Sequence, residues 1–108
     1  MTVDAIALCR ERPDLAAALG ALPALQVRPL PRGPLLQLCD GAGAPLVTLE
    51  GPTLVRVRGG VERLLGLVVD GPVWWVEARA RDADAYGLAR RVAQALADAA
   101  GGTVWPTP

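Results

Sequence analysis

Apolar and polar positions along this chain follow two periodicities, one typical of strands and the other typical of helices. Residues 2–9 alternate between two faces and predict an opening strand. In residues 12–22, Pro13 stands at a first helical position and leucines recur at i, i+4 and i+7. We therefore expect a short amphipathic helix that ends near Gly20 or Pro23.

The middle of the chain consists of short apolar runs separated by glycine and proline. The runs span residues 25–30, 35–39, 45–50, 53–58, 62–69 and 73–80. Separators at this density, Gly51-Pro52 among them, predict turns between the strands of an antiparallel meander. Residues 61–66 fit one helical turn as well as they fit a strand.

Alternation is clearest in residues 53–58. Val55 and Val57 are expected to face the core. Arg56 and Arg58 then face outward, as charged residues of a half-buried strand do.

A second, longer helix is predicted after Asp82, whose side chain can accept hydrogen bonds from the first backbone N–H groups. One stripe of this helix is apolar and consists of Tyr86, Ala89, Val92, Ala93, Leu96 and Ala100. Gly101 and Gly102 end the helix. Residues 103–106 predict a last short strand, with Trp105 available for the core.

These elements predict an α+β fold, in the order strand, helix, meander, helix, strand. The simplest closed arrangement is an antiparallel sheet of about 5–8 short strands with two helices packed on one face. Residues 1–108 are the size of a single α+β domain. The order of elements loosely resembles a ferredoxin-like sandwich, in which the first strand lies beside the third. That arrangement would bring Cys9 and Cys39 towards one another.

The charge of the chain is balanced, with 11 arginines and 11 acidic residues. No net field attracts nucleic acid or an anionic membrane, and we expect neither as a partner. The longest uncharged run, residues 15–27, is shorter than the ~20 residues needed to span a bilayer. Asp4 stands where a signal peptide carries positive charge, so a cytoplasmic location is expected. The dominance of alanine, arginine, glycine, leucine, proline and valine is typical of a GC-rich, bacterial genome.

Several residue types on which catalysis often depends are missing. The chain has no histidine, lysine, serine or asparagine. It therefore cannot form a Ser-His-Asp triad, a Cys-His pair, a histidine-bearing zinc site, a Walker A loop or a lysine Schiff base. Its only cysteines, Cys9 and Cys39, are too few for a four-cysteine metal site and are expected to be reduced structural thiols. We expect no metal and no cofactor.

The most informative stretch is residues 70–82, DGPVWWVEARARD. Strand alternation places Trp74 on the face that the helices cover. Trp75 then lies on the other face together with Glu77 and Arg79. Tryptophan and arginine are the side chains that most often anchor protein interfaces.

Neighbouring strands are expected to add Glu50, Arg56 and Arg58 to the face of Trp75. Three interpretations of this face remain open. Its charges could pair across strands and stabilise the sheet without further function. The face could bind a protein partner or a second copy of the chain. It could also hold a small molecule, or a carboxylate-based active site, with arginines clamping an anion.

The missing residue types favour the second interpretation over the third. We expect a small, cytoplasmic, non-enzymatic protein without catalytic residues that acts by protein–protein interaction or self-association, as accessory subunits, inhibitors, immunity-type proteins and chaperones do. The alternative is a small-molecule-binding or enzymatic module with an Arg/Glu/Trp site on the sheet.

Overall fold

One antiparallel sheet and two helices on one of its faces make up the described part of the chain. The structure, a computed structural model, describes residues 3–20, 22, 25–33, 35–56 and 72–106. The elements are β1 (Val3–Cys9), α1 (Leu15–Gly20), β2 (Gln26–Pro29), β3 (Leu35–Cys39), β4 (Pro45–Val55), β5 (Val73–Ala80), the 3₁₀ turn η1 (Ala83–Ala85), α3 (Tyr86–Ala100) and β6 (Gly102–Trp105). The six strands lie in the order β2-β3-β4-β5-β1-β6. This confirms the predicted α+β class.

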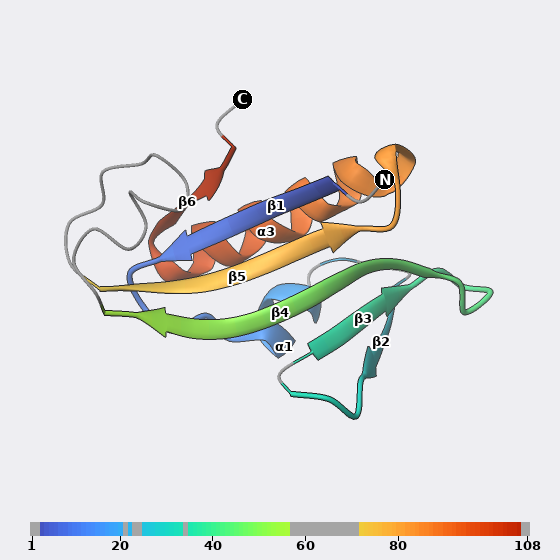
Figure 1. Cartoon of the computed structure of the whole chain (residues 1–108), viewed down its shortest axis with the longest axis horizontal. Helices are drawn as coiled ribbons and strands as arrows, with labels where there is room; N and C mark the ends of the chain where they lie inside the picture. The colour runs from blue at the N-terminus through green and yellow to red at the C-terminus, as the bar shows by residue number, and fades with distance from the viewer. Residues whose placement is uncertain (1–2, 21, 23–24, 34, 57–71, 107–108) are drawn as a thin grey trace.

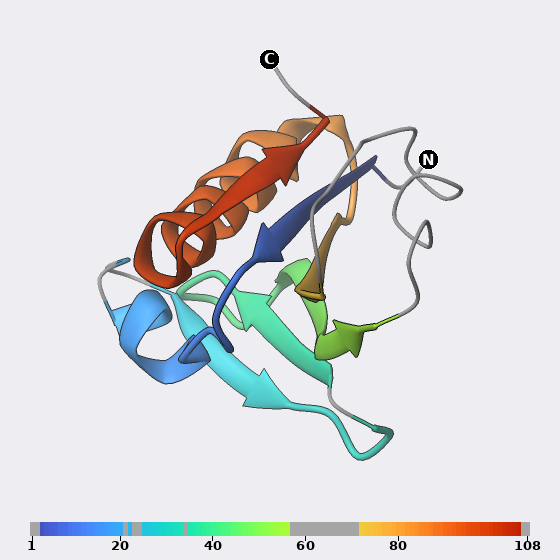
Figure 2. The same cartoon turned by 90° about the vertical axis from the view of Figure 1, so that its left-hand side faces the viewer.

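Both helices lie behind the sheet in Figure 1, and Figure 2 shows the two layers from the side. The buried residues of α3 are Ala89, Val92, Ala93, Leu96, Ala97 and Ala100, which are the predicted stripe apart from Ala97, with Tyr86 half-buried. They meet small side chains of the central strands, such as Ala5, Ala7 and Ala78. Small residues on both sides let α3 approach the sheet closely. Each fully buried valine or leucine in this layer contributes roughly 1.5–3 kcal/mol to stability.

Asp82 acts as a helix cap, as predicted, but it caps the 3₁₀ turn η1; α3 follows directly, and its own N-cap, Ala85, makes no side-chain hydrogen bond. The carboxylate of Asp82 accepts a hydrogen bond of 3.0 Å from the backbone N–H of Ala85. Arg81 donates a second hydrogen bond, of 2.9 Å, to the same carboxylate. Gly101 ends α3 in the left-handed conformation, with φ of 67°.

Strand order separates the two cysteines. β1 lies between β5 and β6, not beside β3, and the ferredoxin-like likeness is not confirmed. Cys9 and Cys39 therefore stand at least three strand spacings apart, about 14 Å, and near opposite ends of β4, so they are beyond disulfide reach. Both are free and buried. Burial raises the pKa of the Cys9 thiol, whose Sγ lies 3.8 Å from the carbonyl oxygen of Leu96.

The structure differs from the sequence prediction at Gly51-Pro52, where a turn was expected. β4 runs through this pair as one strand. Glu50 pairs with Glu77 of β5. Thr53 pairs with Trp75, so three steps along β4 match two steps along β5. The extra residue is a β-bulge.

Gly51 makes the bulge possible. Its φ of 119° lies in a region that other residues rarely adopt, and a Cβ there would lie 2.6 Å from the carbonyl oxygen of Trp75. One extra residue reverses the alternation of the strand that follows. Leu54 consequently pairs with Trp74 on the helix-covered side, whereas Val55 pairs with Val73 on the other side.

Other predictions on the middle of the chain, for Val57, Arg58 and residues 61–66, lie outside the described residues. In the described ranges, no helix combines the length and the apolar character that crossing a membrane requires.

Gly51→Ala is expected to lower the free energy of unfolding by about 1–3 kcal/mol, because alanine is strained at this φ and its methyl group meets backbone atoms. Chemical denaturation followed by circular dichroism measures the effect. Gly87→Ala is the matched control. Gly87 lies in α3 with nothing near the position of a Cβ, so this variant should be up to about 1 kcal/mol more stable than the wild type. Equal stabilities for the two variants would contradict the role given to Gly51.

The Asp82 cap predicts an acid-dependent loss of stability. The hydrogen bond from Ala85, and then that from Arg81, lower the pKa of Asp82 below its ordinary 3.8. A lowered pKa means that the folded state binds this proton less tightly than the unfolded state does. The stabilisation of the folded state by ionised Asp82 is thus present above pH 3.8 and is lost as the pH falls through the pKa that Asp82 has in the folded state. Asp82→Asn keeps an acceptor for Ala85 but cannot titrate, so its unfolding free energy should fall less steeply below pH 4 than that of the wild type. Identical acid profiles would exclude this contribution.

Candidate functional site

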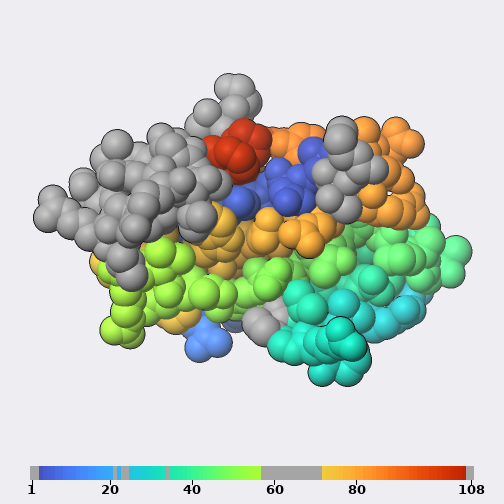
Figure 3. All heavy atoms as spheres, in the orientation of Figure 1, coloured from blue at the N-terminus to red at the C-terminus, as the bar shows by residue number. Residues whose placement is uncertain are grey.

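The face of the sheet opposite α1 and α3 (Figure 1) is the candidate functional site, and we call it the open face. Figure 1 looks onto it, and Figure 3 shows its surface, with β4, β5 and β1 as adjacent bands. Cross-strand pairing determines which side chains meet there, because directly paired residues of antiparallel strands point to the same side. Trp75 of β5 lies between Thr53 of β4 and Leu8 of β1. Glu77 lies between Glu50 and Ile6 in the next row.

An apolar cluster occupies one end of the open face. Its buried members are Ile6, Leu8 and Val73, and Val55, Trp75 and Trp105 pack against them half-buried. We call this group the tryptophan cluster. Trp105 comes from the edge strand β6, where it pairs with Ile6. Two of the three tryptophans of the chain thus meet on this side, while Trp74 packs against the core under the helices.

Charged side chains adjoin the tryptophan cluster. Nε of Arg79 lies 3.4 Å from Oδ1 of Asp4, and Nη2 of Arg79 lies 3.6 Å from Oε1 of Glu77. Glu50 stands directly opposite Glu77. The group contains three carboxylates and one guanidinium, so its formal charge is negative.

This arrangement raises the pKa of Glu77 above its ordinary value. Burial of the carboxyl is the largest cause, followed by a hydrogen bond with Asp4 and the charge of Asp4. The guanidinium of Arg79 acts in the opposite direction, and the charge of Glu50 adds to the rise. Like charges on directly opposed residues destabilise a sheet, and here they lie beside partly buried apolar groups.

A shallow cleft lies where the acidic group meets the tryptophan cluster. It has a volume of about 230 Å³ and is lined by Glu50, Thr53, Val55, Trp75 and Glu77. Small-molecule sites usually enclose about 300–1,000 Å³. This cleft is closer to the size of one long side chain. Two carboxylates beside an indole and a valine match a side chain with an apolar stem and a cationic head, such as arginine or lysine.

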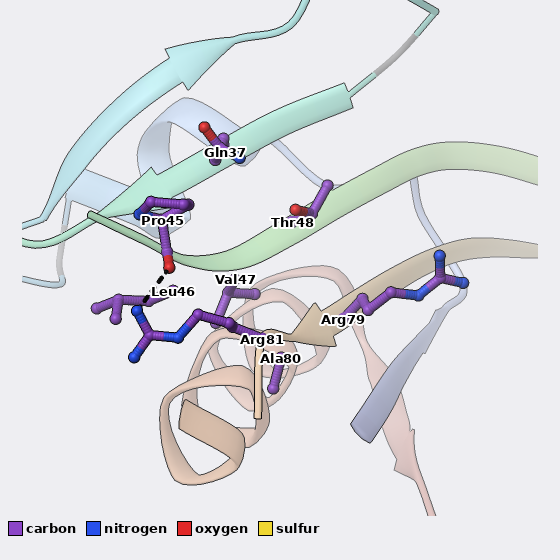
Figure 4. Close-up of a pocket in the computed structure, with 8 residues that line it drawn as sticks. All are labelled: Gln37, Pro45, Leu46, Val47, Thr48, Arg79, Ala80 and Arg81. Atoms are coloured by element: carbon purple, nitrogen blue, oxygen red, sulfur yellow. Dashed lines mark hydrogen bonds between the residues drawn. The ribbon is translucent and has the colours of Figure 1, made fainter. Parts of the chain in front are cut away.

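The other end of the open face carries arginines. A second hollow, of about 260 Å³, is lined there by Gln37, Pro45, Leu46, Val47, Thr48, Arg79, Ala80 and Arg81 (Figure 4). Nη1 of Arg81 donates a hydrogen bond of 3.3 Å to the carbonyl oxygen of Pro45. Arg28 of β2 pairs with Gln37 at the same end of the sheet. The open face therefore has an acidic middle and a basic end.

Four of the six predicted site residues come together. Trp75, Glu77, Arg79 and Glu50 share the open face, as strand alternation predicts. Arg56 does not join them, which corrects the expectation for that residue. It lines a separate hollow with Trp74, because the bulge in β4 has reversed the alternation before Arg56. Arg58 lies outside the described residues.

Two residues of the open face were not predicted as part of the site. Asp4 reaches Arg79 because β1 pairs with β5, and Trp105 reaches Ile6 because β6 pairs with β1. The alternation of residues 2–9 already places Asp4 on the side of Ile6 and Leu8. That signal shows the face of Asp4 within its own strand, but not the strand that lies beside it.

Within the described residues, no group of three or more Cys, Asp or Glu side chains is placed to hold a metal ion. Comparisons with protein-family models, curated proteins and solved structures found no match to this chain. The open face thus combines an acidic cleft with the half-buried indole of Trp75.

Glu77→Gln is expected to make the protein more stable at neutral pH. Because the pKa of Glu77 is raised on folding, the folded state binds this proton more tightly than the unfolded state does. The wild type should therefore lose stability as the pH rises from the ordinary value of 4.5 through the folded pKa. The glutamine variant should lack that loss, in urea denaturation between about pH 4 and pH 8.

Glu11→Gln is the control, since Glu11 is exposed and lies in the connection after β1. It should follow the wild-type pH profile. A Glu77→Gln protein that is less stable than the wild type at pH 7 would show that attraction to Arg79 outweighs burial and the repulsion from Asp4.

Proposed function

We propose that this protein is a non-enzymatic binding protein that contacts another protein chain through its open face. The observation that carries the proposal is the cleft in which the indole of Trp75 adjoins the unbalanced carboxylates of Glu50 and Glu77. Trp75 supplies a large apolar contact, and the carboxylates supply charge for which Arg79 is the only ion-pair partner among the described residues. An aromatic anchor beside charged groups is the usual composition of an interface hot spot.

A partner protein fits this face better than a free small molecule does. The cleft is small and shallow, whereas the side chains that could contact a partner extend over β3, β4, β5 and β1. Burial, and then the repulsion from Asp4 and Glu50, raise the pKa of Glu77, and a cationic side chain brought to Glu50 and Glu77 would counter both effects. The free energy gained on binding would then include the relief of a cost already present in the unbound protein.

A second copy of the chain is the partner that the charges favour. The acidic middle of the face holds Glu50 and Glu77, and its basic end holds Arg28 together with Arg81, whose charge Asp82 offsets in part. In a two-fold symmetric pair, the same surface patch meets itself in reverse, so the basic end of each copy can face the acidic cleft of the other. The proposal places this pair in the cytoplasm, the compartment in which free cysteines such as Cys9 and Cys39 are usual.

Light scattering coupled to size-exclusion chromatography tests the proposal. The wild type should approach twice the chain mass of 11.2 kDa as its concentration rises. Glu50→Arg reverses the charge at the exposed side of the cleft and should weaken self-association about tenfold or more, because it sets arginine against arginine. Trp75→Ala should weaken it as well, provided that circular dichroism shows a folded protein.

Asp98→Arg is the matched control, since it makes the same charge change on the exposed surface of α3. It should associate as the wild type does. The proposal fails if two results occur together. The wild type stays monomeric up to about millimolar concentration, and the wild type and Trp75→Ala capture the same proteins from a cell lysate. It also fails if Glu50→Arg and Asp98→Arg associate equally well.

A further inference from the structure

A second hollow lies at the opposite side of the sheet, near the end of β4 and the start of β5. It has a volume of about 490 Å³ and is lined by Arg10, Leu54, Arg56, Pro72 and Trp74. Leu54 and Trp74 are cross-strand partners on the side of the sheet that carries the helices. We call this the Trp74 hollow. It shares no lining residue with the cleft on the open face.

Arginines gather around this hollow. Arg10 and Arg56 line it, and the guanidinium carbon of Arg12 lies 5.5 Å from the centre of the Trp74 ring. All three arginines are exposed. In the described part of the chain, none of the three forms an ion pair, and no acidic residue lines the hollow.

The walls between these charges are apolar. Trp74 packs against the core under the helices, and its rim is left half-exposed. Leu54 and Pro72 complete the apolar lining. A rigid indole beside guanidinium groups combines a flat contact surface with fixed positive charge, since arginine remains protonated at any physiological pH.

We propose that the Trp74 hollow binds a small organic anion. Arg10 and Arg56 hold its carboxylate or phosphate group, and a flat apolar body lies against Trp74, Leu54 and Pro72. The planar guanidinium donates paired N–H bonds that match the oxygens of either acidic group. The volume falls within the usual range for small-molecule sites, whereas that of the open-face cleft does not.

A purely structural role explains this cluster poorly. Arginines that stabilise a fold usually do so by pairing with carboxylates or carbonyl oxygens, as Arg79 and Arg81 do. At the Trp74 hollow, positive charge accumulates beside an apolar surface, and no residue of the described ranges forms an ion pair with these arginines. An anionic ligand would supply a counter-charge to these arginines and cover the apolar wall at the same time.

Isothermal titration of the wild type with benzoate and with phenyl phosphate tests the proposal. Both probes carry a flat ring, and they differ in the acidic group. At least one should bind with a Kd in the millimolar range or below. Inorganic phosphate has no apolar body and benzyl alcohol has no charge, so each should bind about tenfold more weakly than the better probe. The stronger of the two aromatic probes identifies the ligand as a carboxylate or as a phosphate.

Substitutions test whether the probe binds in the Trp74 hollow. Arg56→Gln should weaken the better probe about tenfold. Arg91→Gln, on the exposed surface of α3, is the matched control and should leave binding unchanged. In a protein carrying Trp75→Phe and Trp105→Phe, Trp74 is the only tryptophan, and its fluorescence should change as the probe binds.

The proposal is overturned if neither aromatic anion binds below about 10 mM, if benzyl alcohol binds as tightly as the anions, or if Arg56→Gln and Arg91→Gln bind alike. None of these measurements depends on self-association. Glu50→Arg, which is designed to disrupt the open face, should leave probe binding intact, so failure of one proposal is distinguishable from failure of the other.

Discussion

The pairing of β5 with β1 on one side and β4 on the other is the constraint on which the rest of this structure depends. Successive side chains of a strand point to opposite faces, so this central strand builds two surfaces at once. On one face Ala78 lies between Ala5 and Leu49, and together they leave room for α3. On the other face Glu77 lies between Ile6 and Glu50. The core and the open face therefore share a single register, and a slip by one residue would exchange them.

The open face carries an electrostatic cost that the fold does not remove. Burial and the neighbouring carboxylates raise the pKa of Glu77, and Arg79 offsets this only in part. A sheet selected for stability alone would place a cation opposite Glu77, where Glu50 stands. Local conflicts of this kind are expected where function competes with stability. This conflict lies beside Trp75, which is the side chain best suited to anchor a partner.

Features that depend on residues close together in the chain could be predicted from the sequence, whereas contacts between strands distant in the chain could not. The cap at Asp82, the buried stripe of α3 and the separation of Trp74 from Trp75 depend on residues close in the chain, and each was predicted. The contact between Asp4 and Arg79 depends on the pairing of β1 with β5. Period-two alternation shows the face of a residue within its own strand but not its neighbouring strand, so such contacts could not be predicted from it.

The bulge at Gly51 explains why Arg56 does not lie on the open face, where the sequence predicts it, and it also shapes both proposed sites. Without the extra residue, regular alternation from Glu50 would carry Arg56 to the open face, where its charge could help to balance the carboxylates. With it, Val55 turns to the tryptophan cluster and Arg56 lines the Trp74 hollow. One residue in β4 thus leaves the acidic cleft short of a cation and supplies that cation to the opposite side of the sheet. The separation of charge between the two surfaces follows from backbone geometry at a glycine, where a Cβ would collide with β5.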